Sequence, residues 1–293
     1  MTYILNVKVD MEKTTEDIIK DIGKLVSNDK LHIICTTNPE FIVQTEKDEE
    51  FLNIINNCDI SIPDGYGVVL ACNYMYRVSR SAIKHFKGIR YFLIGINVFF
   101  DAILNKNIKG ECIRGVDLFF DICEYAEKND KTVFLLGGRQ KDFLGRNVTI
   151  DVDLASIAAS KLKEKYENLR IIGATSKFSY KEKDDQDTLD HIKHCMQSTN
   201  VDHIDFLFVA YGHSNQEKWI NRNAYKIPAK VSIGVGGTLD YVVYPGKRAP
   251  KIFIKYKLEW FYKLITQPWR VKRIINAFPI FPIKVYLSSL KGE

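Results

Sequence analysis

Asp64 is the residue whose position best fits acid–base chemistry. It lies in the turn Pro63–Gly67, directly after a predicted strand and before a predicted helix. Backbone amides and the helix dipole at such a turn bind anions, and a carboxylate there can take a proton from an acceptor hydroxyl. Its position alone leaves a second interpretation open, because Asp often caps the helix that follows it.

Thr36, Thr37 and Asn38 follow the preceding predicted strand. Their hydroxyl and amide groups can hydrogen-bond a sugar ring. The alternative is a turn that leads into the next helix, with Pro39 in the first turn of that helix. The sequence thus offers a base and polar neighbours for a hydroxyl-bearing ligand.

Glycine-containing turns after three further predicted strands suit a nucleotide diphosphate. No G-x-G-x-x-G fingerprint follows Gly137 and Gly138, which disfavours a dinucleotide but leaves room for one nucleotide. A uracil-ribose-diphosphate lying across the strand ends would meet glycine backbone and the cations that follow it. The candidate binding residues in these turns and in that of Asp64 are Gly65, Gly137, Gly138, Gly212, Gln216, Glu217, Gly236, Gly237, Asp240, Lys247 and Arg248.

The sequence predicts neither a metal site nor a cofactor. His213 and Glu217 are one helical turn apart, but no third ligand accompanies them. The six cysteines are scattered without metal-type spacing, which indicates reduced thiols.

The positive charge of the chain is concentrated in its C-terminal tail. The net charge is +6, and residues 247–293 hold 11 of the 42 Lys and Arg but only 2 of the 36 Asp and Glu. Arg270 and Arg273 are three residues apart, so on a helix they share one face and can close on a diphosphate. Interleaved aromatic residues suit an anionic membrane surface, although basic aromatic helices also bind RNA or pack on their own domain. These aromatic residues are Trp260, Phe261, Tyr262 and Trp269.

The elements that position these residues alternate between strands and helices, which predicts a Rossmann-like α/β fold with a mainly parallel sheet flanked by helices. Predicted strands are 31–35, 59–62, 132–136, 170–172, 206–210 and 231–235. Predicted helices are 41–57, 116–128, 154–166, 188–197 and 214–223. We expect a catalytic domain over residues 1–245 and a basic, aromatic, helical appendage over residues 246–293.

The expected location is cytoplasmic, at the inner face of the membrane. Residues 1–10 lack the basic start and apolar core of a secretory signal. The most apolar window, Tyr91–Leu104, is too short to cross a bilayer, which needs about 20 apolar residues.

The ordered motifs of the chain resemble the WecG/TagA/CpsF glycosyltransferase family, which builds wall teichoic acid and related bacterial surface polysaccharides. The resemblance runs from about Thr36 to Arg273. Its motifs are Asn38-Pro39-Glu40, Pro63-Asp64-Gly65, Gly115-Val116-Asp117-Leu118, Phe134–Gly138, Gln216–Ile220, Gly234–Gly237, Lys247–Pro250 and Leu258-Glu259-Trp260.

The resemblance implies an inverting, metal-independent transfer of an N-acetylmannosamine-type sugar. The donor would be its UDP form and the acceptor undecaprenyl-diphosphate-linked N-acetylglucosamine. Asp64 falls on the family's proposed base and Thr37 on a nearby catalytic threonine, while Arg270 and Arg273 match arginines that close over the donor diphosphate. Self-association in solution is also implied.

Several positions depart from the family pattern. The family often has Arg three residues before the glycine of Gly-x-Asp-Leu; here Cys112 takes that place and Arg114 stands beside it. Lys263 sits where Arg is common. The connection between the Asp-Gly and Gly-x-Asp-Leu motifs is longer and includes Tyr91–Leu104; we hypothesise that this insertion touches the bilayer or the polyprenyl chain.

Two alternatives follow from the same sequence. A nicotinamide-dependent oxidoreductase would use the alternating fold but lacks the dinucleotide fingerprint. A nucleic-acid- or lipid-binding protein would use the basic tail and leave Asp64 and the glycine turns without a role. Because basic charge is confined to the tail, we expect no nucleic-acid partner.

Overall fold

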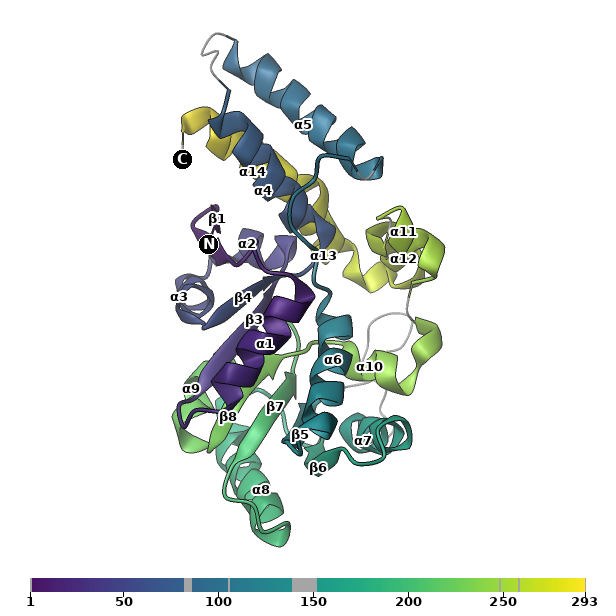
Figure 1. Ribbon diagram of the computed structural model, residues 1–293. Helices are drawn as coiled ribbons and strands as arrows, with labels where there is room; N and C mark the ends of the chain where they lie inside the picture. Colours follow the sequence, from purple (N-terminus) through teal and green to yellow (C-terminus); the bar gives the residue numbers. More distant parts are fainter. Residues whose placement is uncertain are drawn as a thin grey trace.

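A parallel sheet of six strands lies at the centre of the molecule (Figure 1). The computed structural model describes residues 2–81, 86–104, 106–138, 152–247, 249–257 and 259–292. The strand order is β4-β3-β8-β7-β5-β6, and every pairing is parallel. Each predicted strand overlaps one of these strands, which confirms the predicted fold class. The bounds are β3 His32–Thr37, β4 Ile60–Pro63, β5 Thr132–Gly137, β6 Arg170–Thr175, β7 Ile204–Ala210 and β8 Ala229–Gly234.

Helices cover both faces of the sheet because its strands are apolar on both sides. Val133 and Leu135 of β5 pack in one core cluster with α1, α6, α7 and α10, whereas Phe134 and Leu136 pack in another with α8 and α9. The bounds are α1 Thr15–Val26, α6 Gly115–Lys128, α7 Leu154–Lys165, α8 Asp185–Ser198, α9 Asn215–Asn223 and α10 Thr238–Val243.

The predicted single helix over residues 41–57 is wrong. The chain forms two helices there, α2 (Pro39–Thr45) and α3 (Glu49–Asn57). Asp48 explains the break, because its side chain caps α3 by accepting a hydrogen bond of 3.2 Å from the Phe51 N–H. At the N-terminus, β1 (Thr2–Ile4) and β2 (Val7–Val9) form a separate antiparallel pair.

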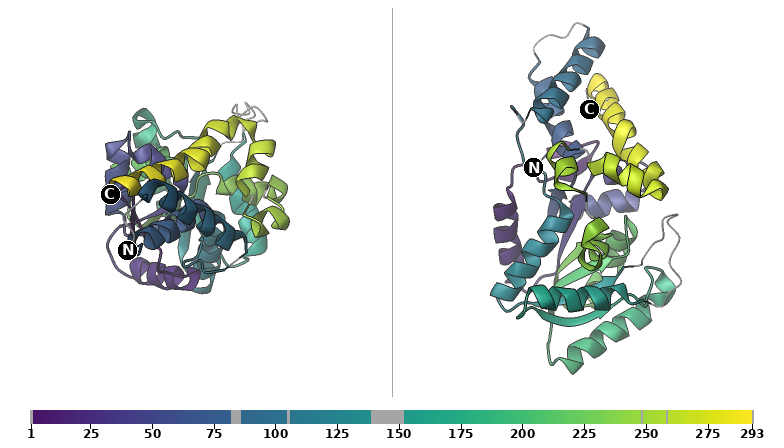
Figure 2. Two further views of the ribbon diagram at one scale, coloured as in Figure 1. Left: turned by 90° about the horizontal axis from the view of Figure 1, so that it is seen from above. Right: turned by 90° about the vertical axis from the view of Figure 1, so that its right-hand side faces the viewer.

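A group of helices lies beyond the carboxyl ends of the strands (Figures 1 and 2). It contains α4 (Tyr66–Ser79), α5 (Lys87–Ile103) and the C-terminal helix α14 (Phe281–Lys291), which packs on α2, α4 and α5. Phe281 and Val285 of α14 are buried in one core cluster with residues of α4 and α5. Before α14 the tail forms α11 (Lys251–Lys255), α12 (Glu259–Thr266) and α13 (Val271–Ile275). Among the described residues, no helix combines the length and apolar character that a membrane crossing requires.

Candidate functional site

Asp64 is fixed by backbone contacts to two neighbouring elements. Its N–H donates a 2.9 Å hydrogen bond to the carbonyl of Thr37, at the end of β3. One carboxylate oxygen, Oδ1, accepts a 3.3 Å hydrogen bond from the N–H of Gly115, the first residue of α6. The residue preceding α4 is Gly65, at a φ of +89°, and α4 has no side-chain cap. Asp64 therefore faces the start of α6 and does not cap the helix that follows it.

The surroundings of Asp64 raise its pKa to about 6. Removal of water from the carboxylate is the largest cause, and the nearby charge of Glu259 acts in the same direction. Lys263, the Gly115 hydrogen bond and Arg114 oppose the shift. The carboxylate is therefore ionised at neutral pH and is still a much better proton acceptor than an ordinary Asp.

Glu259 of α12 joins the two cations near Asp64. Its Oε1 lies 2.7 Å from Lys263 Nζ, and its Oε2 lies 3.7 Å from Arg114 Nε. Burial acts to lower the pKa of Lys263, but Glu259, Tyr241 and Asp64 raise it above its ordinary value. Lys263 therefore stays protonated, and the predicted ligand Arg114 lies in the same charged group as the base.

The three polar residues Thr36, Thr37 and Asn38, at the end of β3 and directly after it, have different surroundings. A Cβ added to Gly115 would lie 3.3 Å from Thr36 Cγ2 and 3.8 Å from Asp64 Oδ2, so Thr36 and Asp64 border the same small space. Thr37 is fully buried, and its hydroxyl lies 2.7 Å from the hydroxyl of Ser61. Asn38 caps α2 by accepting a 3.0 Å hydrogen bond from the Phe41 N–H. Of the three side chains, the structure brings that of Thr36 next to Asp64.

A cavity of about 740 Å³ lies between the glycine turns and the tail. Predicted ligands that line it are Gly137, Gly138, Gly212, Gly236, Gly237, Asp240, Arg270 and Arg273. Gly137, Gly138 and Gly212 have φ values of +87°, +92° and +83°, which side-chain-bearing residues rarely adopt. The cavity therefore exposes backbone on one side and two guanidinium groups on the other.

Gln216 and Glu217 are not among the residues that line this cavity; they lie behind its wall. Gln216 Oε1 accepts hydrogen bonds from the N–H groups of Gly212, at 3.2 Å, and Gly236, at 2.9 Å. Its Nε2 donates to Glu217 Oε1 at 2.7 Å. Burial raises the pKa of Glu217 to about 7, and its other oxygen has no hydrogen-bond partner among the described residues. These two predicted ligands hold the glycine turns in place.

The tail brings its two predicted arginines to the cavity. Arg273 Nε lies 2.8 Å from both carboxylate oxygens of Glu40, at the start of α2. Burial lowers the pKa of Arg270, an effect that Arg273 reinforces and that Tyr241 and Asp240 oppose. Arg270 and Arg273 thus place two interacting cations in one partly buried site. Such a pair suits a doubly charged ligand, for example a diphosphate.

The remaining residues that the sequence singled out do not line the cavity or lie outside the described residues. His213 packs against Phe41 at a ring distance of 4.6 Å, and burial lowers its pKa to about 3. Within the described residues, no three His, Cys, Asp or Glu side chains group as metal ligands would. Arg248 and the side chain of Lys247 lie outside the described part of the chain.

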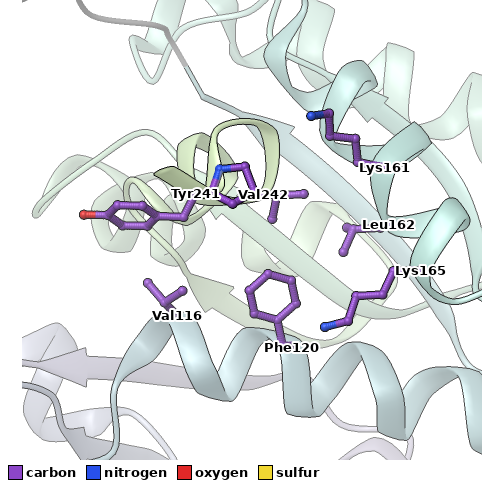
Figure 3. Close-up of a pocket in the computed structure, with 8 residues that line it drawn as sticks. Val116, Phe120, Lys161, Leu162, Lys165, Tyr241 and Val242 are labelled. Carbon is purple, nitrogen blue, oxygen red and sulfur yellow. The ribbon is translucent and has the colours of Figure 1, made fainter. Parts of the chain in front are cut away.

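The sequence did not single out Tyr241, Glu40 or Glu259 as site residues. Glu40 and Glu259 stand inside recognised motifs, so their positions were a signal. Tyr241 had none: it lines the cavity described above and also a second cavity of about 310 Å³ between α6, α7 and α10 (Figure 3). It raises the pKa of both Lys263 and Arg270, so it lies near a cation of each group.

Sequence comparison finds a matching family model and curated relatives. A family model described as "Glycosyl transferase WecG/TagA/CpsF family" matches residues 2–96 and 92–293. The chain is 29% identical over 261 residues to the N-acetylglucosaminyldiphosphoundecaprenol N-acetyl-beta-D-mannosaminyltransferase of Bacillus subtilis (strain 168), which covers 89% of this chain and 80% of that protein. It is 25% identical over 286 residues to the enzyme of the same name from Staphylococcus aureus (strain MRSA252), with 97% and 92% covered.

Proposed function

The chain belongs to the WecG/TagA/CpsF family of glycosyltransferases, and on that premise we propose that it transfers an N-acetylmannosamine-type sugar from its UDP form to undecaprenyl-diphosphate-linked N-acetylglucosamine. The proposal rests on two features, a carboxylate of pKa about 6, Asp64, and a cavity lined by glycine turns, Arg270 and Arg273. Asp64 does not itself line the cavity; Lys263, which interacts with both Asp64 and the cavity residue Tyr241, links the two. The name that the relatives share, which contains N-acetylglucosaminyldiphosphoundecaprenol, supports this acceptor. Neither a nicotinamide-dependent oxidoreductase nor a nucleic-acid- or lipid-binding protein without enzymatic activity fits a glycosyltransferase family.

In the proposed reaction Asp64 is the base. It takes the proton of an acceptor hydroxyl while that oxygen forms a bond to the anomeric carbon of the donor sugar. The bond from this carbon to the UDP oxygen breaks, and UDP leaves on the opposite face, so the configuration inverts. Thr36 lies beside the base, where its methyl group borders the space that the acceptor would enter, while its hydroxyl donates to the carbonyl of Gly234 at 3.5 Å. Thr37, buried behind it, helps to position Asp64 through its carbonyl.

Arg270 and Arg273 would stabilise the leaving diphosphate. Negative charge grows on UDP as the glycosidic bond breaks, and preorganised cations at that point lower the barrier. Both arginines line the cavity, and Asp240, which also lines it, interacts with Arg270. We propose that this pair supplies the charge neutralisation without a metal ion.

A peripheral position on the inner face of the membrane would bring the site to its lipid-borne acceptor. The tail supports this because several of its apolar side chains are exposed next to lysines and arginines. These side chains are Ile252, Tyr256, Phe261, Ile265, Val271 and Ile275.

Asp64→Asn tests the role of the base. We expect transfer from UDP-N-acetylmannosamine to a short-chain lipid-diphosphate-linked N-acetylglucosamine to fall by about a hundredfold or more, since a general base contributes 10²–10⁴-fold. UDP affinity, measured by calorimetry, should stay unchanged. Asp121→Asn is the matched control, because Asp121 also has a raised pKa but lies on α6 away from the cavity. Normal turnover in Asp64→Asn would exclude Asp64 as the base.

A separate experiment identifies the donor sugar: transfer is measured with a panel of UDP-sugars and the same acceptor.

A further inference from the structure

Helix α5 has an apolar face that no other part of the described chain covers. The exposed apolar residues recur every three or four positions, which places them on one side of the helix. Phe92 is 59% exposed and Phe99 is 52% exposed. The opposite side, with Tyr91, Val98 and Ala102, is buried against the molecule. The other exposed apolar residues of this face are Ile89, Leu93, Ile96, Phe100, Ile103 and Leu104.

The exposed apolar residues of α5 follow one another along one side of the helix and are not scattered over the surface. Contiguous exposed apolar patches on soluble proteins mark interaction sites. The face lies beyond the carboxyl ends of the strands, the same end of the sheet at which Asp64 is found (Figure 1). A partner that binds this face would therefore lie at the same end of the molecule as the proposed base.

Charge around α5 indicates what that occupant is. Residues 77–110 contain seven Lys or Arg and a single acidic residue, Asp101. Asp101 does not oppose an anionic partner, because it is paired with Arg77 at 2.7 Å on the side of α4. A helix with an apolar face and flanking cations, and no exposed acidic group on that face, is complementary to a bilayer with anionic headgroups.

We infer that α5 lies in the membrane interface, with its apolar face among the acyl chains and its flanking cations at anionic headgroups. A single polyprenyl chain, the other occupant that the sequence left open, would need a groove. Neither of the two cavities described above is lined by an α5 residue. The inference goes beyond the proposed function, because binding of α5 to lipid requires neither donor nor acceptor.

Sedimentation with lipid vesicles tests the inference. We expect the full chain to partition more strongly onto vesicles of phosphatidylglycerol mixed with phosphatidylcholine than onto pure phosphatidylcholine. The double variant Phe92→Glu/Phe99→Glu should lower the partition coefficient by about tenfold or more, because two charges enter the apolar face. The matched control is Tyr225→Glu/Ile157→Glu, which changes two exposed apolar residues, one directly after α9 and one in α7; both helices lie at the end of the molecule opposite α5 (Figure 1). Equal partition of the two double variants would overturn the inference.

A depth measurement separates insertion of α5 from binding through the tail. Phe99→Trp adds an indole to the α5 face, and we expect brominated phospholipid to quench it beyond the quenching of the wild-type tryptophans. Tyr225→Trp should show no added quenching. If light scattering showed a lipid-free dimer that Phe92→Glu/Phe99→Glu dissociated without changing vesicle partition, the face would be an interface between two copies and the inference would fail.

Measuring transfer to a water-soluble, short-chain acceptor distinguishes a failure of this inference from a failure of the proposed function. Phe92→Glu/Phe99→Glu should retain that activity, since neither residue belongs to the site. A wild-type protein without transfer activity would contradict the proposed function and leave the vesicle result intact.

Discussion

Asp64 keeps a raised pKa although two cations, Lys263 and Arg114, stand close to it. Loss of water around the carboxylate outweighs their attraction, and Glu259 weakens it further by pairing with both. This balance makes the residue a base that is charged at neutral pH and yet binds a proton readily. The chemistry of the site is thus set by what surrounds one carboxylate.

The pKa of Asp64 predicts the acid limb of the reaction. We expect kcat/KM for transfer to fall below pH about 6, approaching tenfold per pH unit, because the protonated carboxyl cannot accept a proton. A pH–rate profile measures it. An acid limb centred near pH 4 would show that Asp64 is solvated as in a free peptide.

The same shift has a stability consequence. A carboxyl whose folded pKa is raised contributes stability at low pH, and this contribution is lost as pH rises through about 6. The free energy of unfolding, measured by urea denaturation at pH 8, should therefore be about 1–3 kcal/mol higher for Asp64→Asn than for the wild type. At pH 5 this difference should be smaller.

Glu40 is expected to orient Arg273 toward the donor. Glu40→Gln removes a charge-assisted contact worth about 1.5–3 kcal/mol, so KM for the UDP-sugar should rise by about tenfold with a smaller change in kcat. Glu46→Gln is the control, because Glu46 also pairs with the tail, at Lys284, but away from the cavity. A lowered KM in Glu40→Gln would mean that Glu40 withholds Arg273 from the donor.

At the scale of elements, the turns after β7 and β8 act as one unit because Gln216 accepts hydrogen bonds from both. Gln216→Leu leaves two glycine N–H groups without this acceptor. We expect a loss of about 1–3 kcal/mol in unfolding free energy and weaker UDP binding in calorimetry. Unchanged UDP affinity in a folded variant would show that the turns hold their shape without Gln216.

Apolar runs made the strands of the sheet predictable, because a strand buried on both faces needs nearly continuous apolar residues. The break between α2 and α3 was not predictable in the same way: apolar spacing continues across it, and Asp48 ends the helix by capping. Thr36 and Thr37 show a further limit. The resemblance assigned the catalytic role to Thr37, but the side chain of Thr37 is buried against Ser61 and that of Thr36 borders Asp64, since adjacent residues of a strand point to opposite faces.

The contacts of the tail with the site were outside what local sequence can show. Their spacing predicted that Arg270 and Arg273 bind one ligand together. Their position at the cavity depends on the docking of α14 against α4 and α5, which lie more than 170 residues earlier in the chain. The division at residues 245 and 246 and self-association stay predictions.

At the scale of the whole molecule, α14 anchors the tail. Phe281 is 2% exposed, and Phe281→Ala should cost about 3–5 kcal/mol of docking free energy. We expect limited proteolysis to remove the tail faster in this variant and transfer to fall with it. Ile283→Ala, two residues away and 52% exposed, is the control. Equal proteolysis of the two variants would show that the tail is held elsewhere.

Helix α4 joins the two ends of this arrangement, since Asp64 stands just before it and α5 follows it. A helix turns by about 100° with each residue, so its length also sets a direction. One residue inserted into α4 would rotate the remainder of that helix by about that angle relative to Asp64, whereas seven would nearly restore the original orientation. We therefore expect length variation in this helix, natural or engineered, to be tolerated in steps that follow the helical period.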